Sequence, residues 1–117
     1  MNPLVSFGVE IDEVLDWHDG PSLFTGHDRD GRHYLAVQVA GTPMARRWMF
    51  AAISTVALRC VLIGDAEIRD AFRHSLTGYI ETVSIDRAGR VTGSMLLCTE
   101  LSDDLLPDEG ERLALAA

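Results

Sequence analysis

Two short segments with the same spacing, Asp28-Arg29-Asp30-Gly31 and Asp86-Arg87-Ala88-Gly89, constrain the fold of this chain more than any other feature. Each begins with Asp and ends with Gly, which is typical of a tight turn whose last residue has a left-handed backbone conformation. The residues that flank each segment alternate between apolar and polar, as β-strands do. The sequence therefore predicts two antiparallel β-hairpins.

The turn geometry also predicts which residues face each other across each hairpin. The expected cross-strand partners are Leu23 with Val37, Gly26 with Tyr34, His27 with His33, Glu81 with Met95, and Val83 with Gly93. In the second hairpin this register gathers Ser and Thr side chains on one face. We therefore expect a sheet with one buried and one solvated face.

The segment between the hairpins has the pattern of helices. Ser54 predicts an N-cap for a helix through Ile63 that ends at Gly64, and a second short helix is expected through His74. The fold class predicted for residues 1–117 is a single α+β domain. It is an antiparallel sheet of about five strands in two hairpin regions, with the helical segment Ser54 to His74 inserted between strands three and four.

The charge of the chain excludes several functions. Eighteen acidic residues against ten basic ones give a net charge of −8, and all ten basic residues are Arg. Such a field repels phosphate, so we expect no binding to nucleic acid and none to anionic membranes. The absence of Lys excludes a P-loop lysine and a Schiff-base nucleophile. Basic protein partners are favoured instead.

The two cysteines, Cys60 and Cys98, lie in apolar runs without metal-ligand spacing. They are predicted to be free thiols of a reducing compartment. The first ten residues lack the features of a signal peptide, and no apolar run is long enough to span a bilayer. We therefore expect a cytoplasmic protein.

Histidines give the first candidate for chemistry. His18, His27 and His33 lie close together in the sequence with several Asp residues, and the expected pairing of His27 with His33 is compatible with a metal or acid/base site. The alternative is a hairpin end where two imidazoles meet solvent. No spacing matches an established metal or catalytic motif, so neither a metal nor a cofactor is assigned.

Two apolar groups are candidates for a protein interface. Trp48 and Phe50 could form a partner-binding patch, although membership of the core is the alternative. Leu58 and Leu62 belong to a helix that is apolar around most of its circumference. Either the C-terminal tail or a second copy of the chain should cover it, and a homodimer is the favoured expectation.

Four strings of residues together resemble an uncharacterised bacterial family of small domains of unknown function. They are Asp19-Gly20-Pro21-x-Leu23-Phe24, Asp28-Arg29-Asp30-Gly31-Arg32-x-Tyr34-Leu35, Gly64-Asp65 followed by Ile68-Arg69-Asp70-Ala71-Phe72, and Leu105-Leu106-Pro107-x-Glu109-Gly110-x-Arg112-Leu113. The resemblance extends from about Asp16 to near the end of the chain. It implies a fold and no activity or catalytic residues.

These observations favour a non-enzymatic acidic protein-interaction module. Such a module could be the neutralising or accessory partner in a bacterial defence, toxin–antitoxin or phage system. The first alternative is a small metal-dependent or acid/base hydrolase that uses His27 and His33. A second alternative is an acidic mimic of DNA, which requires carboxylates spaced along one face like phosphates.

Overall fold

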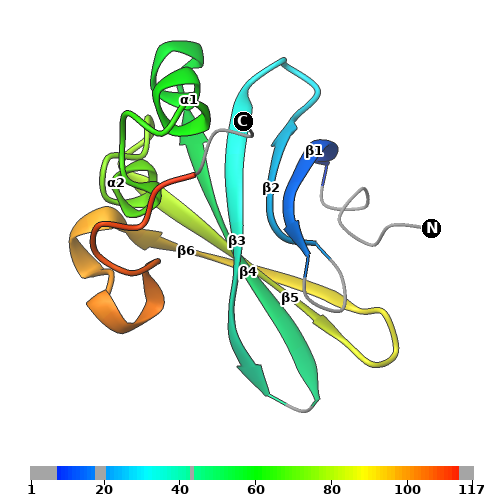
Figure 1. Ribbon diagram of the computed structural model, residues 1–117. Coiled ribbons are helices and arrows are strands. Elements are labelled where there is room, and N and C mark those ends of the chain that lie inside the picture. The colour runs from blue at the N-terminus through cyan, green and yellow to red at the C-terminus, as the bar shows by residue number, and fades with distance from the viewer. Residues whose placement is uncertain (1–7, 18–20, 43, 114–117) are drawn as a thin grey trace.

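A computed structural model describes residues 8–17, 21–42 and 44–113 of the chain. Within this part, six strands form one antiparallel sheet in which each strand pairs with its neighbour in sequence, in the order β1-β2-β3-β4-β5-β6. The strands are β1 Glu10–Trp17, β2 Pro21–His27, β3 His33–Thr42, β4 Ala45–Ile53, β5 Tyr79–Asp86 and β6 Val91–Leu97. The sheet is strongly twisted, so that β5 and β6 run across the direction of β1 and β2 (Figure 1).

The two predicted hairpins are present with the predicted registers. His27 pairs with His33 and Leu23 with Val37 in the first hairpin, as Glu81 pairs with Met95 in the second. Gly31 and Gly89 both have a φ of +81°, which is the left-handed conformation that the two turns require. In each turn the opening Asp carboxylate accepts the backbone N–H groups of the residues two and four positions later. These local hydrogen bonds explain why the register could be predicted from the turn.

The strand count differs from the prediction of about five. Residues 10–17 form a full edge strand, β1, which raises the count to six. The helical segment consequently follows the fourth strand, not the third. It contains α1 (Thr55–Leu62), whose N-cap Ser54 accepts the N–H of Ala57, and α2 (Ile68–Arg73). No helix in the described part of the chain is long and apolar enough to cross a membrane.

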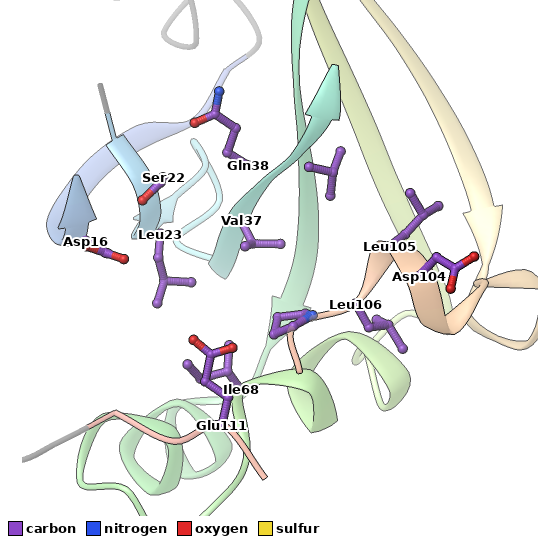
Figure 2. Close-up of a pocket in the computed structure, with 12 residues that line it drawn as sticks. Asp16, Ser22, Leu23, Val37, Gln38, Ile68, Asp104, Leu105, Leu106 and Glu111 are labelled. Carbon is purple, nitrogen blue, oxygen red and sulfur yellow. The ribbon is translucent and has the colours of Figure 1, made fainter. Parts of the chain in front are cut away.

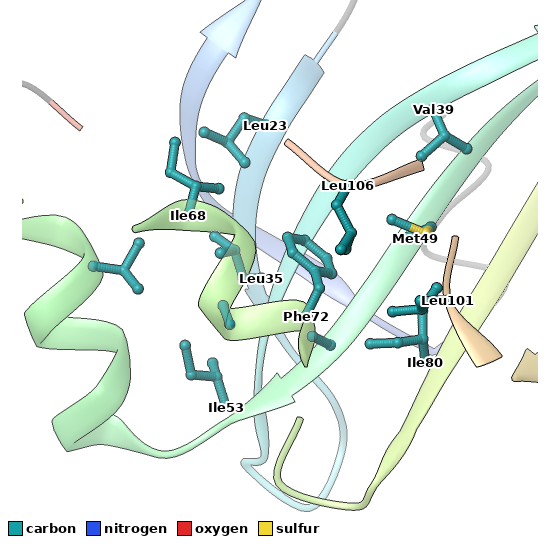
Figure 3. Packing of buried hydrophobic residues seen from close by; sticks show 13 residues of the cluster. Leu23, Leu35, Val39, Met49, Ile53, Ile68, Phe72, Ile80, Leu101 and Leu106 are labelled. Carbon is teal, nitrogen blue, oxygen red and sulfur yellow. The ribbon is translucent and has the colours of Figure 1, made fainter. Parts of the chain in front are cut away.

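Both faces of the sheet carry buried apolar clusters, so the expected solvated face is wrong. On one face, α1, α2 and the C-terminal segment cover a cluster that includes Leu35, Met49, Phe72 and Ile80 (Figure 3). On the other face a second cluster forms around Phe24, Phe50, Tyr34, Trp48 and Val83. The partly buried Ile11 of β1 and Val91 of β6 both pack against this second cluster. The two edges contribute to one cluster because the twisted sheet curves around it.

The C-terminal segment packs against the helical face. Leu101 and Leu106 are buried in the cluster of Figure 3. Asp103 forms ion pairs with Arg69 and Arg73 of α2, and the guanidinium of Arg112 donates hydrogen bonds to the carbonyl oxygens of Gly64 and Asp65. The C-terminal segment is thus held against the helical face by apolar burial, by ion pairs to α2 and by hydrogen bonds to the turn after α1.

Candidate protein-interaction site

The β6 strand forms one edge of the sheet, and its outer side is open in the described part of the chain. Val91–Leu97 pair with β5 through a continuous register without a bulge. Apart from this ladder, no backbone–backbone hydrogen bond in the described residues involves residues 91–97. The outward N–H and C=O groups of an edge strand form a template on which another strand can add. The strand has neither a charged residue nor a proline to oppose such pairing.

Exposed apolar side chains lie beside this open edge. Met95 is 59% exposed, and the cross-strand partners Leu97 and Tyr79 are 41% and 44% exposed. All three project from the same face, because side chains alternate along a strand and Tyr79 lies directly opposite Leu97. A contiguous apolar group next to an unpaired strand edge is typical of an interaction surface.

The opposite edge, β1, has a different construction. Its eight residues include the acids Glu10, Asp12, Glu13 and Asp16, and its pairing with β2 shifts register at three places. Charged side chains and bulges are two of the devices by which natural sheets prevent edge-to-edge pairing. Strand addition at β1 is therefore disfavoured, although Val14 of this strand is 41% exposed.

A polar cluster lies on the same sheet face as Met95, close to the exposed apolar group. Glu81 stands between Phe50 of β4 and Met95 of β6 in the sheet register. Burial raises the pKa of this carboxyl group, whereas the charge of Arg32 lowers it. The hydroxyl of Tyr34 donates a hydrogen bond of 3.1 Å to Asp28 Oδ2. The first hairpin turn is thus tied to this face, and Glu81 is a partly desolvated anion beside the open edge.

The predicted histidine site is only partly assembled. His27 and His33 are cross-strand partners, whereas His18 lies outside the described residues. The structure adds carboxylates of β1 that the sequence did not indicate. His27 Nδ1 lies 2.7 Å from Asp12 Oδ1, and His27 Nε2 lies 3.4 Å from Glu10 Oε2. A pocket of about 320 Å³ adjoins this residue.

This arrangement does not resemble a metal centre. Among the described residues, no group of three or more His, Cys, Asp or Glu side chains could hold a metal ion. The two carboxylates contact opposite nitrogens of the same imidazole, so they cannot share an ion with it. The geometry instead resembles a carboxylate that orients a histidine.

The residues predicted for a partner interface fall into two groups. Trp48 and Phe50 are buried in the second cluster, so they act as core residues in the single chain. The second group, Leu58 and Leu62, lies on α1 and is half-buried, and Leu58 packs against the first cluster. On the outer side of α1, Val56 is 74% exposed. Sequence reasoning missed Met95, Leu97 and Tyr79, since their exposure depends on β6 being the last strand.

Two pockets lie on the helical face of the sheet. One, of about 300 Å³, lies between β2, β3 and the C-terminal segment and includes Leu23, Val37, Ile68 and Glu111 (Figure 2). Asp16, Asp104 and Glu111 supply its carboxylates, so it disfavours anionic ligands. The other, also about 300 Å³, lies between α1 and α2, and both Cys60 and His74 line it.

Comparison with protein-family models, with curated proteins and with solved structures finds no match for this chain.

Proposed function

We propose that this protein is a non-enzymatic, acidic interaction module that binds an extended protein segment by strand addition at the β6 edge. The observation that carries the proposal is the open, uncharged and unbulged β6 strand with exposed Met95 and Leu97. Strand addition gains affinity from backbone hydrogen bonds and specificity from alternate side chains. The outward backbone groups of β6 and the side chains of Met95 and Leu97 can supply both.

The surrounding charge favours a basic partner. The net charge of −8 attracts cationic proteins and repels nucleic acids and anionic membranes. This electrostatic selection supports a role as the neutralising or accessory partner of a basic protein, for example in a defence, toxin–antitoxin or phage system. A neighbouring gene that encodes a basic toxin would support this cellular role.

Affinity capture from the native host with matched variants tests the binding edge. Met95→Lys places a charge on β6, and Val14→Lys places the same charge on β1, at an apolar side chain that is 41% exposed against 59% for Met95. Proteins that bind through β6 should be retained by the unmodified chain and by Val14→Lys but lost with Met95→Lys. Equal retention by both variants, with circular dichroism confirming that both are folded, would exclude the β6 edge.

The contact between His27 and Asp12 favours one second candidate, an acid/base hydrolase. A carboxylate that orients an imidazole is a recurring part of hydrolytic sites. Hydrolysis of ester or phosphate-ester probes that is lost with His27→Ala and weakened with Asp12→Asn would support it.

A further inference from the structure

We infer that the segment which adds to β6 is β6 of a second copy of the chain, giving a continuous sheet across a two-fold axis. This inference rests on the proposed function, because it names the segment that adds to the same edge. A basic protein would then bind the acidic surface outside β6. Its evidence is the sequence of β6 itself, read in the register that a symmetric pair of antiparallel strands must adopt.

Symmetry restricts that register. In a two-fold antiparallel pair, one residue lies on the axis opposite its own copy. β6 has seven residues, and only a register centred on Ser94 pairs all of them. In this register Gly93 faces Met95 of the partner, and Val91 faces Leu97 of the partner.

The facing residues complement each other in size. Gly93 has no side chain, so it leaves room for the Met95 side chain that is 59% exposed in the single chain. Leu97, which is 41% exposed, meets Val91, whose other side already packs against the second core cluster. Each exposed apolar residue of β6 therefore faces glycine or an apolar residue. The core on this face would continue across the two-fold axis.

The charge distribution permits this contact in a strongly acidic protein. Two copies that each carry −8 repel one another at long range. β6 contains no charged residue, whereas β1 contains four acids. Since directly opposed like charges destabilise a strand pair, β6 is the edge at which two copies can approach without that cost.

The apolar side of α1, which the sequence favours for self-association, is the competing surface. Val56 is exposed there, but Leu58 already packs against the first core cluster. The residues of α1 do not specify how two copies would align, whereas those of β6 specify one register between the two strands. Val56→Asp therefore serves as the control that separates the two surfaces.

Disulfide trapping tests the register directly. In a background with Cys60→Ala and Cys98→Ala, Ser94→Cys places two thiols opposite each other, with Cβ atoms about 4.5–5.5 Å apart before adjustment. Thr92→Cys is the matched control, because its copies would lie roughly 13 Å apart along the strands in the same register. We expect mild oxidation to give covalent dimer with Ser94→Cys, several-fold more than with Thr92→Cys. Adding Met95→Lys should suppress it, whereas adding Val56→Asp should not.

Several outcomes would overturn the inference. Equal cross-linking of Ser94→Cys and Thr92→Cys would exclude this register, and suppression by Val56→Asp alone would assign the dimer to α1. Cross-linking that appears only after residues 1–7 are removed would assign the edge to the chain's own N-terminal segment. If trapping fails while capture of another protein still depends on Met95, the second copy is excluded and the proposed function stands. If the trapping fails and no captured protein depends on Met95, the second copy and the proposed function are both excluded.

Discussion

The two edge strands of the sheet both carry unpaired backbone groups, but their sequences treat these groups in opposite ways. β1 carries four acids in eight residues and departs from regular pairing at three places. β6 has seven uncharged residues in an uninterrupted register, and Met95 and Leu97 are exposed on it. Unprotected edges promote aggregation, so natural sheets rarely leave them open. The contrast supports the proposal that β6 pairs with another strand and that β1 does not.

The largest expected effect comes from placing a charge on the open edge. Met95→Lys should weaken self-association by about a hundred-fold or more, because each dimer loses two methionine burials of about 1.5–3 kcal/mol. Sedimentation equilibrium measures the change. The matched Val14→Lys on β1 should leave the dimer constant unchanged, and a similar loss in both variants would remove the distinction between the edges.

Ionic strength should have the next largest effect. Salt screens the repulsion between two chains of charge −8, whereas the uncharged β6 contact is not weakened. Light scattering at low and high sodium chloride should therefore show self-association that strengthens several-fold as salt increases. Weakening with salt would indicate that ion pairs hold the dimer, which is incompatible with a contact through β6.

Removing acidic side chains from β1 should have a smaller effect on association. Glu13→Val together with Asp16→Val deletes two of the four edge acids and should produce some larger oligomers, limited by the remaining register shifts. Size-exclusion chromatography detects them. The control is Glu109→Gln together with Asp108→Asn, which removes the same charge from the C-terminal segment. Equal oligomer formation in the control would attribute the effect to net charge alone.

The smallest effect concerns Glu81, the partly buried anion beside β6. Burial raises the pKa of this carboxyl in the folded state, so the folded chain binds its proton more tightly than the unfolded chain does. Ionised Glu81 therefore opposes folding above its folded pKa, and this opposition disappears as the pH falls below the unfolded value. Glu81→Gln should raise the melting temperature slightly at pH 7, and the gain should vanish in mild acid. Thermal melts across this range test it, and a gain that grows with acidity would contradict the sign.

Local chemistry explains which parts of this structure could be predicted from the sequence. The carboxylates of Asp28 and Asp86 bond to backbone N–H groups within the same turn, so the register of both hairpins follows from a few neighbouring residues. The cap at Ser54 is local in the same way. The burial of the second face was missed because it depends on the curvature of the whole sheet, which lets Ile11 and Val91 share a cluster.

The position of the candidate site depends on how segments far apart in the sequence are arranged. That β6 lacks charge is visible in the sequence, but that it is an edge follows only from the order of all six strands. The contact of His27 with Asp12 was missed for a related reason: Asp12 lies within a bulge of β1, and the bulge changes which side chains meet.

Hydrogen–deuterium exchange on the unmodified protein compares the two edges most directly. Amides of 91–97 and of 10–17 can be followed in one experiment at low and at high protein concentration. We predict that protection of the β6 amides increases with concentration, because their outward N–H groups become hydrogen-bonded, and that protection of the β1 amides does not change. Protection that is independent of concentration at β6, or that increases at β1 instead, would contradict the assignment of β6 as the pairing edge.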